Sequence, residues 1–211
     1  MSSIDKVLDL AGLGFRLHPL HSRNKVPLLG QWQKRASTVE STLRLWATQY
    51  KDCNWGIATG EESGIVVIDI DPTHDGHITW DALIRENGEV KTVSVKTGSG
   101  GTHYYFKYPT GESIGNSPGN MGKGIDVRGN DGQVVAPYSI HPNGNVYQWI
   151  KSPDDIEIAD LPLWILDRIK TGVIADYSSV GHNIEKGNRN NSIYHAALAL
   201  ARQGSPMEFA L

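Results

Sequence analysis

The stretch Gly64-Ile65-Val66-Val67-Ile68-Asp69-Ile70-Asp71-Pro72 is an apolar run that ends in two acidic residues. Side chains alternate along a strand, so Asp69 and Asp71 share one face with the apolar residues at 65 and 67. Two carboxylates this close repel each other, and burying uncompensated charge is costly. A hard divalent cation such as Mg²⁺ relieves the repulsion, with substrate phosphates as its remaining ligands. The stretch therefore predicts a metal-dependent site for phosphate chemistry.

Composition narrows the class of protein. The 211 residues, 39% of them hydrophobic, suit one large domain, or one domain and part of a second. No run approaches the roughly 20 apolar residues of a membrane span, so we expect no membrane partner. The single cysteine, Cys53, excludes an internal disulfide framework and a cysteine-rich zinc site, and we expect a cytoplasmic protein. The net charge of -3 argues against a strong non-specific DNA binder but leaves nucleic acid open as a partner.

Hydrophobic periodicity and turn residues predict a mixture of helices and short strands. We expect helices over 4–11, from a Thr38 cap to about residue 50, from a Thr79 cap to residue 87, and after Asp160-Leu161-Pro162. We expect strands over 15–20, 55–58, 91–97, 102–108, 124–128, 133–137 and 146–150, and a loop over 23–32. Many short strands separated by Gly, Pro and Asn turns favour an antiparallel sheet in a fold of mixed α and β elements.

The C-terminal part of the chain is predicted to lie outside the catalytic domain. We expect residues 1–170 to form the catalytic domain and 171–188 to form a polar linker. Residues 189–211 are interpreted as the truncated start of a helical module, with a helix over about 191–203. Ser205-Pro206-Met207-Glu208 has the cap, proline and glutamate of a helix start, close to the last residue. A helix that short is not stable alone, so we expect the chain to be part of a longer protein.

A glycine-rich turn precedes a histidine in Thr97-Gly98-Ser99-Gly100-Gly101-Thr102-His103. Such a turn exposes backbone N–H groups that can bind an anion, and His103 begins the next strand within reach of a phosphate oxygen. The alternative is a simple hairpin turn with a half-buried histidine.

Two later segments carry further polar residues on or after strands. In Gly124-Ile125-Asp126-Val127-Arg128-Gly129, Asp126 and Arg128 share one strand face, where a third carboxylate completes a metal site and an arginine binds phosphate. The alternative is a solvated ion pair on an edge strand. Ser139 and His141 follow the strand that ends at Pro137 and are candidate donors to ribose or phosphate. For each of these two, a structural turn is an equally good interpretation.

A basic cluster near the N-terminus contains Lys25, Trp32, Lys34 and Arg35. Cationic side chains around an aromatic ring suit a single-stranded template, because the ring stacks on a base while the cations contact phosphates. The alternative is an ordinary solvated loop with Trp32 in the core.

Together these segments resemble the primase-polymerase domain of the archaeo-eukaryotic primase superfamily, as found in plasmid and phage replication proteins. The resemblance runs from about Gly14 to Trp149. Its motifs keep their order and spacing: Asn24-Lys25-Val26-Pro27 with Trp32, Asn54-Trp55-Gly56-Ile57-Ala58-Thr59-Gly60, the aspartate strand, Ser99-Gly100-Gly101-Thr102-His103-Tyr104-Tyr105-Phe106, the Asp126 segment, and the Ser139/His141 loop that closes on Tyr147 and Trp149.

The resemblance implies a function and assigns roles to residues. It implies an α+β primase-polymerase fold, with mixed and antiparallel sheets flanked by helices and the active site in a central cleft. Asp69, Asp71 and Asp126 would hold two Mg²⁺ or Mn²⁺ ions, and His103 beside the Ser99–Gly101 turn would contact the triphosphate. Arg128, Ser139 and His141 are further candidates for nucleotide binding.

The resemblance also implies a reaction and partners. The activity would be template-directed DNA primase and polymerase chemistry in replication, by a two-metal mechanism. The substrates would be NTPs or dNTPs on single-stranded DNA, and a helicase region in the full-length protein would be a further partner.

Two other functions compete with this one. A metal-dependent glycosyltransferase also uses Asp-x-Asp after a strand, but the chain before Asp69 shows no convincing nucleotide-sugar pocket. A catalytically inactive nucleic-acid-binding module would keep the fold without the activity. The three retained carboxylates argue against that second alternative.

Overall fold

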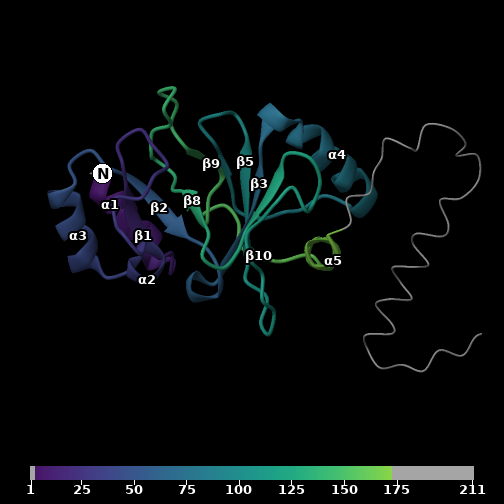
Figure 1. Ribbon diagram of the computed structural model, residues 1–211, viewed down its shortest axis with the longest axis horizontal. Helices are drawn as coiled ribbons and strands as arrows, with labels where there is room; N and C mark the ends of the chain where they lie inside the picture. The colour runs from purple at the N-terminus through teal and green to yellow at the C-terminus, as the bar shows by residue number, and fades with distance from the viewer. Residues whose placement is uncertain (1–2, 173–211) are drawn as a thin grey trace, which may run out of the picture. The chain divides into compact units, whose positions relative to one another are not determined.

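The computed structural model describes residues 3–172, which form two β-sheets flanked by helices (Figure 1). The helices are α1 (Ser3–Gly12), α2 (Trp32–Arg35), α3 (Glu40–Gln49), α4 (Gly76–Asn87) and α5 (Leu163–Thr171), with 3₁₀ turns η1 (Glu61–Ser63) and η2 (Pro72–His74). The strands are β1 (Leu17–Leu20), β2 (Asn54–Ala58), β3 (Ile65–Ile70), β4 (Ser94–Lys96), β5 (Thr102–Lys107), β6 (Ser117–Pro118), β7 (Ile125–Arg128), β8 (Gln133–Val135), β9 (Gln148–Lys151) and β10 (Ala159–Asp160). Residues 173–211, which include nearly all of the predicted linker and the whole predicted helical segment, lie outside the described residues.

Strand pairing confirms the expected α+β class. The smaller sheet has the order β1-β2-β8, and the larger has the order β6-β7-β3-β5-β4-β9. Every ladder between these strands is antiparallel, while the short β10 pairs in parallel with β5. Strand β3, which carries the Asp-x-Asp run, lies between β5 and β7 inside the larger sheet. Its side chains are therefore flanked by other strands on both sides.

The larger sheet buries both of its faces, and β3 supplies each with alternate side chains. Val66, Ile68 and Ile70 pack in a core with residues of α4 and α5. Ile65 and Val67 belong to the other core, which fills the space between the larger sheet and the smaller one. This division is the alternation expected from the sequence, and it places Asp69 on the face toward the smaller sheet.

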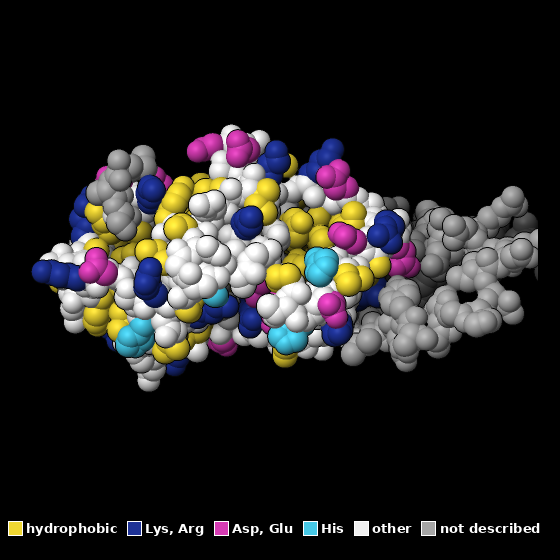
Figure 2. Space-filling view, turned by 90° about the horizontal axis from the view of Figure 1, so that it is seen from above, with side chains coloured by type: hydrophobic (Ala, Val, Ile, Leu, Met, Phe, Trp, Pro, Cys, Tyr) yellow, Lys and Arg dark blue, Asp and Glu magenta, His cyan; other side chains and the backbone are white. Residues whose placement is uncertain are grey.

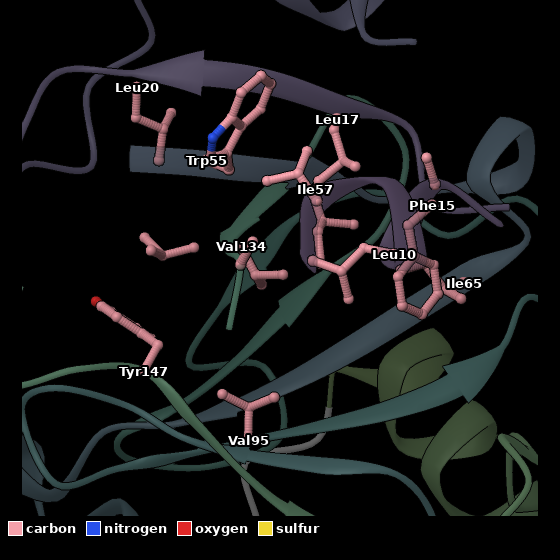
Figure 3. Packing of buried hydrophobic residues seen from close by; sticks show 14 of the residues in the cluster. Leu10, Phe15, Leu17, Leu20, Trp55, Ile57, Ile65, Val95, Val134 and Tyr147 are labelled. Carbon is pink, nitrogen blue, oxygen red and sulfur yellow. The ribbon is translucent and has the colours of Figure 1, made fainter. Parts of the chain in front are cut away.

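The core between the sheets draws side chains from elements distant in sequence (Figure 3). Its members include Leu10 from α1, Leu17 from β1, Ile57 from β2, Ile65 from β3, Val95 from β4 and Val134 from β8. Each of these is at most 4% exposed. Burial of such side chains stabilises the fold by roughly 1.5–3 kcal/mol each. The smaller sheet is thus fixed against the face that carries Asp69.

Three local predictions were wrong. Helix α4 begins at Gly76 instead of Thr79, whose hydroxyl donates to the Lys123 carbonyl at 2.9 Å. The early start depends on glycine, because a Cβ at Gly76 would lie 2.2 Å from the Gly124 carbonyl oxygen. Helix α3 begins at Glu40 with no side-chain cap, so Thr38 is not its cap. A short helix, α2, begins at the last residue of the expected loop over 23–32.

No helix within residues 3–172 has the length and apolar character needed to span a bilayer.

His18 on β1 is a buried histidine with an unusual environment. It is fully buried, its ring stacks on Trp32 at 4.5 Å between centroids, and neither ring nitrogen has a hydrogen-bond partner within residues 3–172. Burial lowers the pKa of His18 to about 4, and the Pro19 backbone opposes this effect. The neighbouring Gly56 makes room for the ring, since a Cβ there would lie 2.6 Å from Nε2. His18 is therefore neutral in the folded protein at neutral pH.

We predict that acid destabilises the protein through His18. Between pH 6.5 and 4 the unfolded chain binds a proton at His18 that the folded chain does not, so the free energy of unfolding falls by up to about 3 kcal/mol as the pH decreases through this window. Urea unfolding at a series of pH values measures the slope. His18→Leu should make it shallower, while the exposed control His21→Leu should leave it unchanged. Equal slopes in wild type and His18→Leu would contradict the assignment.

Candidate active site

Asp69 lies at the centre of a cluster of polar side chains on three adjacent strands. Its Cα is the register partner of His103 on β5 and of Asp126 on β7. Residues directly opposite one another in antiparallel strands have Cβ atoms about 4.5–5.5 Å apart. The side chains of Asp69 and Asp126 are 23% and 31% exposed, so both carboxylates are partly withdrawn from water. Three segments that are far apart in sequence thus meet at one point.

Arg128 compensates the two neighbouring carboxylates. Its Nη2 atom lies 2.8 Å from Asp126 Oδ2 and 3.5 Å from Asp69 Oδ2. Asp126 Oδ1 also accepts a hydrogen bond from the Gly119 amide at 3.2 Å. Strand β7 lies between β6 and β3 and is not an edge strand, so Asp126 and Arg128 do not form the solvated edge pair of the alternative interpretation. The guanidinium carries the positive charge that two adjacent carboxylates require.

Asp71 makes a different set of contacts. One of its oxygens accepts from the Thr73 amide at 2.9 Å and the Thr73 hydroxyl at 2.7 Å, and the other lies 2.8 Å from His74 Nδ1. Burial raises the pKa of the Asp71 carboxyl, but the hydrogen bonds from Thr73 and His74 outweigh burial and lower that pKa below its usual value. Asp71 is therefore ionised, and it stabilises the turn that follows β3.

The placement of these carboxylates allows a test of their fit to a divalent metal. Within residues 3–172 no three histidine, cysteine or acidic side chains converge as a ready-made metal site. Asp69 and Asp126 nevertheless fit a cation, because they are adjacent, partly buried, and already share the positive charge of Arg128. Carboxylate oxygens are the ligands that Mg²⁺ and Mn²⁺ prefer. Asp71 stands two residues beyond Asp69, held by its own turn.

His103 is buried beside Asp69. It is 5% exposed, its Nε2 lies 3.4 Å from Asp69 Oδ1, and its Nδ1 has no hydrogen-bond partner within the described residues. Burial lowers the pKa of His103; Asp69 opposes this effect, and the cations Lys25 and Arg128 add to it. The imidazole is therefore neutral at neutral pH and carries a single N–H.

Of the four residues predicted to bind template, Lys25 is the one whose charge acts on His103. Its backbone carbonyl accepts a hydrogen bond from Gln133 Nε2 at 3.0 Å. Trp32 and Lys34 line a separate cavity of about 360 Å³ with residues that include Thr59 and Asn130. Trp32 is partly buried and packs against the core, as its alternative interpretation proposed.

Arg35 completes the predicted template group. It is an exposed residue at the end of α2, and its amide donates to the Gln31 carbonyl. The space-filling view shows Lys and Arg side chains interspersed with Asp and Glu, without a continuous basic stripe on the face in view (Figure 2). This face therefore offers no broad positive field to a nucleic acid.

The glycine turn lies next to the end of β3. The Thr97 amide donates to the Gly101 carbonyl at 2.9 Å, and the Gly101 amide donates to Thr97 Oγ1 at 2.8 Å. A Cβ at Gly101 would lie 2.2 Å from the Ile70 carbonyl oxygen, so glycine permits this close approach. Within residues 3–172 the amides of Gly98 and Ser99 donate to no protein acceptor. The turn thus has two backbone N–H groups that this part of the chain does not use, one on buried Gly98 and one on exposed Ser99.

Ser139 and His141 occupy different environments. Ser139 is buried, and its hydroxyl accepts from the Trp55 amide at 3.0 Å and contacts the Trp55 carbonyl at 3.3 Å. The hydroxyl is therefore used within the protein, as its structural alternative proposed. His141 packs against Gly98, because a Cβ on that glycine would lie 2.1 Å from His141 Cβ.

Several residues of the site were missed by the sequence analysis. Tyr105 and Tyr147 are buried close to Asp69, where burial and the Asp69 charge raise the pKa of both phenols. Strand alternation is the signal that could have found Tyr105, since it lies two residues after His103 on the same face. Asn143 and Asn145 were also missed, and each donates to the Gly98 carbonyl at 2.9 Å.

Comparison with known proteins adds one finding. The family model described as "Bifunctional DNA primase/polymerase, N-terminal" matches residues 7–164. That range contains every residue placed in the site above. No curated protein gave a match.

We predict that Arg128 and a divalent cation substitute for each other at Asp69 and Asp126. Arg128→Met leaves two facing carboxylates without a cation and should lower the free energy of unfolding by about 1–2 kcal/mol. Mg²⁺ or Mn²⁺ should then raise the melting temperature of this variant more than that of wild type.

Arg44→Met is the control, because Arg44 pairs with Glu40 on an exposed helix face at 2.7 Å. It should respond to metal as wild type does. Identical metal-induced shifts in all three proteins would show that no cation binds between Asp69 and Asp126.

Proposed function

Because the chain belongs to the bifunctional DNA primase/polymerase family over residues 7–164, we propose that it catalyses template-directed nucleotidyl transfer in the replication of a plasmid, phage or similar element. The reaction joins a 3′-hydroxyl to the α-phosphorus of an NTP or dNTP and releases pyrophosphate. The observation that carries the proposal is the convergence of Asp69, Asp126 and His103 on adjacent strands. Such a cluster combines carboxylates for a cation with a donor for a phosphate.

The carboxylates would hold the catalytic cations. Asp69 and Asp126 are adjacent, and Asp71 would join them by exchanging its contacts with Thr73 and His74. When bound, Mg²⁺ or Mn²⁺ lowers the pKa of the attacking hydroxyl and neutralises charge on the phosphates. Asp69 and Asp126 are already held in place by strand pairing, so little rearrangement is needed at these two positions. A pair of such ions, as in the two-metal mechanism, remains part of this proposal.

The cationic and donor groups around the carboxylates suit the nucleotide. Arg128 sits beside both carboxylates, and Lys25 acts on the same region from the loop before α2. Arginine binds phosphate with two parallel N–H groups. Neutral His103 can donate one N–H to a phosphate oxygen, and the amides of Gly98 and Ser99 add further donors. His141 packs on this turn and stays a candidate contact, whereas the hydroxyl of Ser139 is already engaged.

Single-stranded template would bind along the N-terminal part of the domain. Trp32 and Lys34 share a cavity large enough for one base, with a volume of about 360 Å³. Stacking on an aromatic ring contributes about 1–3 kcal/mol per base and tolerates any sequence. Lys25 and Arg35 would contact the phosphate backbone on either side of that base.

The family assignment bears differently on nucleotidyl transfer and on the two competing functions. It supports nucleotidyl transfer and gives no support to a glycosyltransferase. An inactive nucleic-acid-binding module remains the second candidate, and it predicts DNA binding without metal and without synthesis. Primer synthesis on single-stranded DNA with Mg²⁺ or Mn²⁺, with NTPs and dNTPs compared, separates the two functions.

We predict that Asp69→Asn abolishes synthesis while the fold persists. The amide keeps the size of the side chain but loses the charge that holds a cation, so kcat should fall about 10³-fold or more. Incorporation of labelled nucleotide on a primed template measures the rate, and circular dichroism checks the fold. Asp154→Asn, at an exposed position in the turn before β10, is the matched control and should retain activity. Near-normal synthesis by Asp69→Asn would remove the basis of the proposed function.

We predict that His103→Gln weakens nucleotide binding more than it slows chemistry. A hydrogen bond to a charged phosphate contributes about 1.5–3 kcal/mol, which corresponds to a rise of roughly 10- to 100-fold in the KM for nucleotide. Steady-state kinetics at varied dNTP concentration give KM and kcat separately. A KM equal to that of wild type would place His103 away from the triphosphate.

A further inference from the structure

Two asparagine side chains hold a single carbonyl in the glycine turn. Asn143 Nδ2 and Asn145 Nδ2 each donate to the Gly98 carbonyl oxygen at 2.9 Å. We propose that Asn143 and Asn145 are positioning residues that orient the Gly98–Ser99 peptide so that its N–H faces a phosphate of the incoming nucleotide. This inference rests on the proposed function, and it assigns a role to two residues that contact neither Asp69 nor His103.

Peptide geometry explains how a bond to a carbonyl controls an amide. The Gly98 carbonyl and the Ser99 N–H belong to one planar trans unit and point in opposite directions. When both asparagines fix the carbonyl, they also fix the direction of the Ser99 N–H. That N–H donates to no acceptor within residues 3–172. Two donors on the carbonyl also polarise the peptide, which makes its N–H a stronger donor.

The turn needs such a restraint because of its composition. Three of the five residues in Thr97-Gly98-Ser99-Gly100-Gly101 are glycine, which loses the most conformational entropy on ordering. Gly101 packs on the Ile70 carbonyl, so one end of the turn is fixed to β3. Gly98 packs on His141, so the other end is fixed to the 139–147 segment that carries both asparagines. Without the asparagines, the hydrogen bonds within residues 3–172 that hold the middle of the turn all come from Thr97.

The segment that carries the asparagines is itself rigidly anchored. The Asn145 amide donates to Asn143 Oδ1 at 2.9 Å, and the His141 amide donates to the Asn145 carbonyl at 2.7 Å. On the other side, Asn54 of β2 donates to the Ile140 carbonyl at 2.7 Å and accepts from its amide at 2.9 Å. Hydrogen bonds at both ends of the 140–145 segment therefore link the smaller sheet to the glycine turn. Tyr147 adds ring contacts, with its centroid 6.1 Å from both His103 and His141.

A kinetic comparison of single and double variants tests the proposal. Asn143→Ala, Asn145→Ala and the double variant should raise the KM for dNTP, by about three- to tenfold for each single change, with kcat nearly unchanged. Asn87→Ala is the matched control, because Asn87 donates its amide to the Leu83 carbonyl at the same 2.9 Å, within α4. It should leave KM unchanged. A loss of stability alone would lower the active fraction and kcat without raising KM.

Hydrogen–deuterium exchange of the 97–101 segment gives a readout that does not depend on activity. Exchange should quicken in the double variant and stay at the wild-type rate in Asn87→Ala. Unchanged exchange in the double variant, or faster exchange with an unchanged KM, would overturn the positioning role. A wild-type protein that neither binds dATP with Mg²⁺ nor incorporates it would instead overturn the proposed function, and with it the phosphate that this peptide is proposed to meet.

Discussion

The repulsion between the adjacent carboxylates of Asp69 and Asp126 is the constraint on which the site depends. Strand register places them opposite each other, and like charges in that position are destabilising. Arg128 supplies the opposite charge from the same strand as Asp126. The register itself is fixed by hydrophobic alternation, since a slip of one residue would move Asp69 into the apolar core under α4 and α5. The interior of the larger sheet thus stabilises a charge arrangement that would not persist alone.

The two sheets have different roles in the domain. The larger sheet carries Asp69, His103 and Asp126, while the smaller sheet and its helices cover the same face and bring Lys25 toward His103. The link between the sheets is partly apolar and partly a chain of side-chain amides from Asn54 to the glycine turn. Apolar packing fixes distances between layers, but it does not orient a peptide group. The directional hydrogen bonds supply that orientation.

The sequence predicted the parts of this site that depend on local rules. Alternation along β3 correctly predicted which face of the sheet Asp69 and the apolar residues occupy. A strand that is buried on both faces leaves little freedom in the direction of each side chain. The family resemblance followed from the ordered motifs, and the α+β class followed from that resemblance. To predict that Asp69 and Asp126 are neighbours, one must know the order of strands in the sheet. Local sequence patterns do not encode that order. The helix start at Thr79 was wrong because close backbone packing at Gly76 overrode side-chain capping. The start at Thr38 was wrong because α3 begins at Glu40 without a side-chain cap. Asn143 and Asn145 resembled ordinary turn residues, since their acceptor lies more than forty residues away.

A crystal structure with Mn²⁺ and a non-hydrolysable dNTP tests the central claim most directly. Anomalous scattering locates Mn²⁺ independently of any assumption about its ligands. The account predicts a Mn²⁺ peak within coordination distance of both Asp69 and Asp126, with the triphosphate beside His103 and the Thr97–Gly101 turn. A Mn²⁺ ion and nucleotide bound elsewhere, with Arg128 still bridging the two carboxylates, would contradict it.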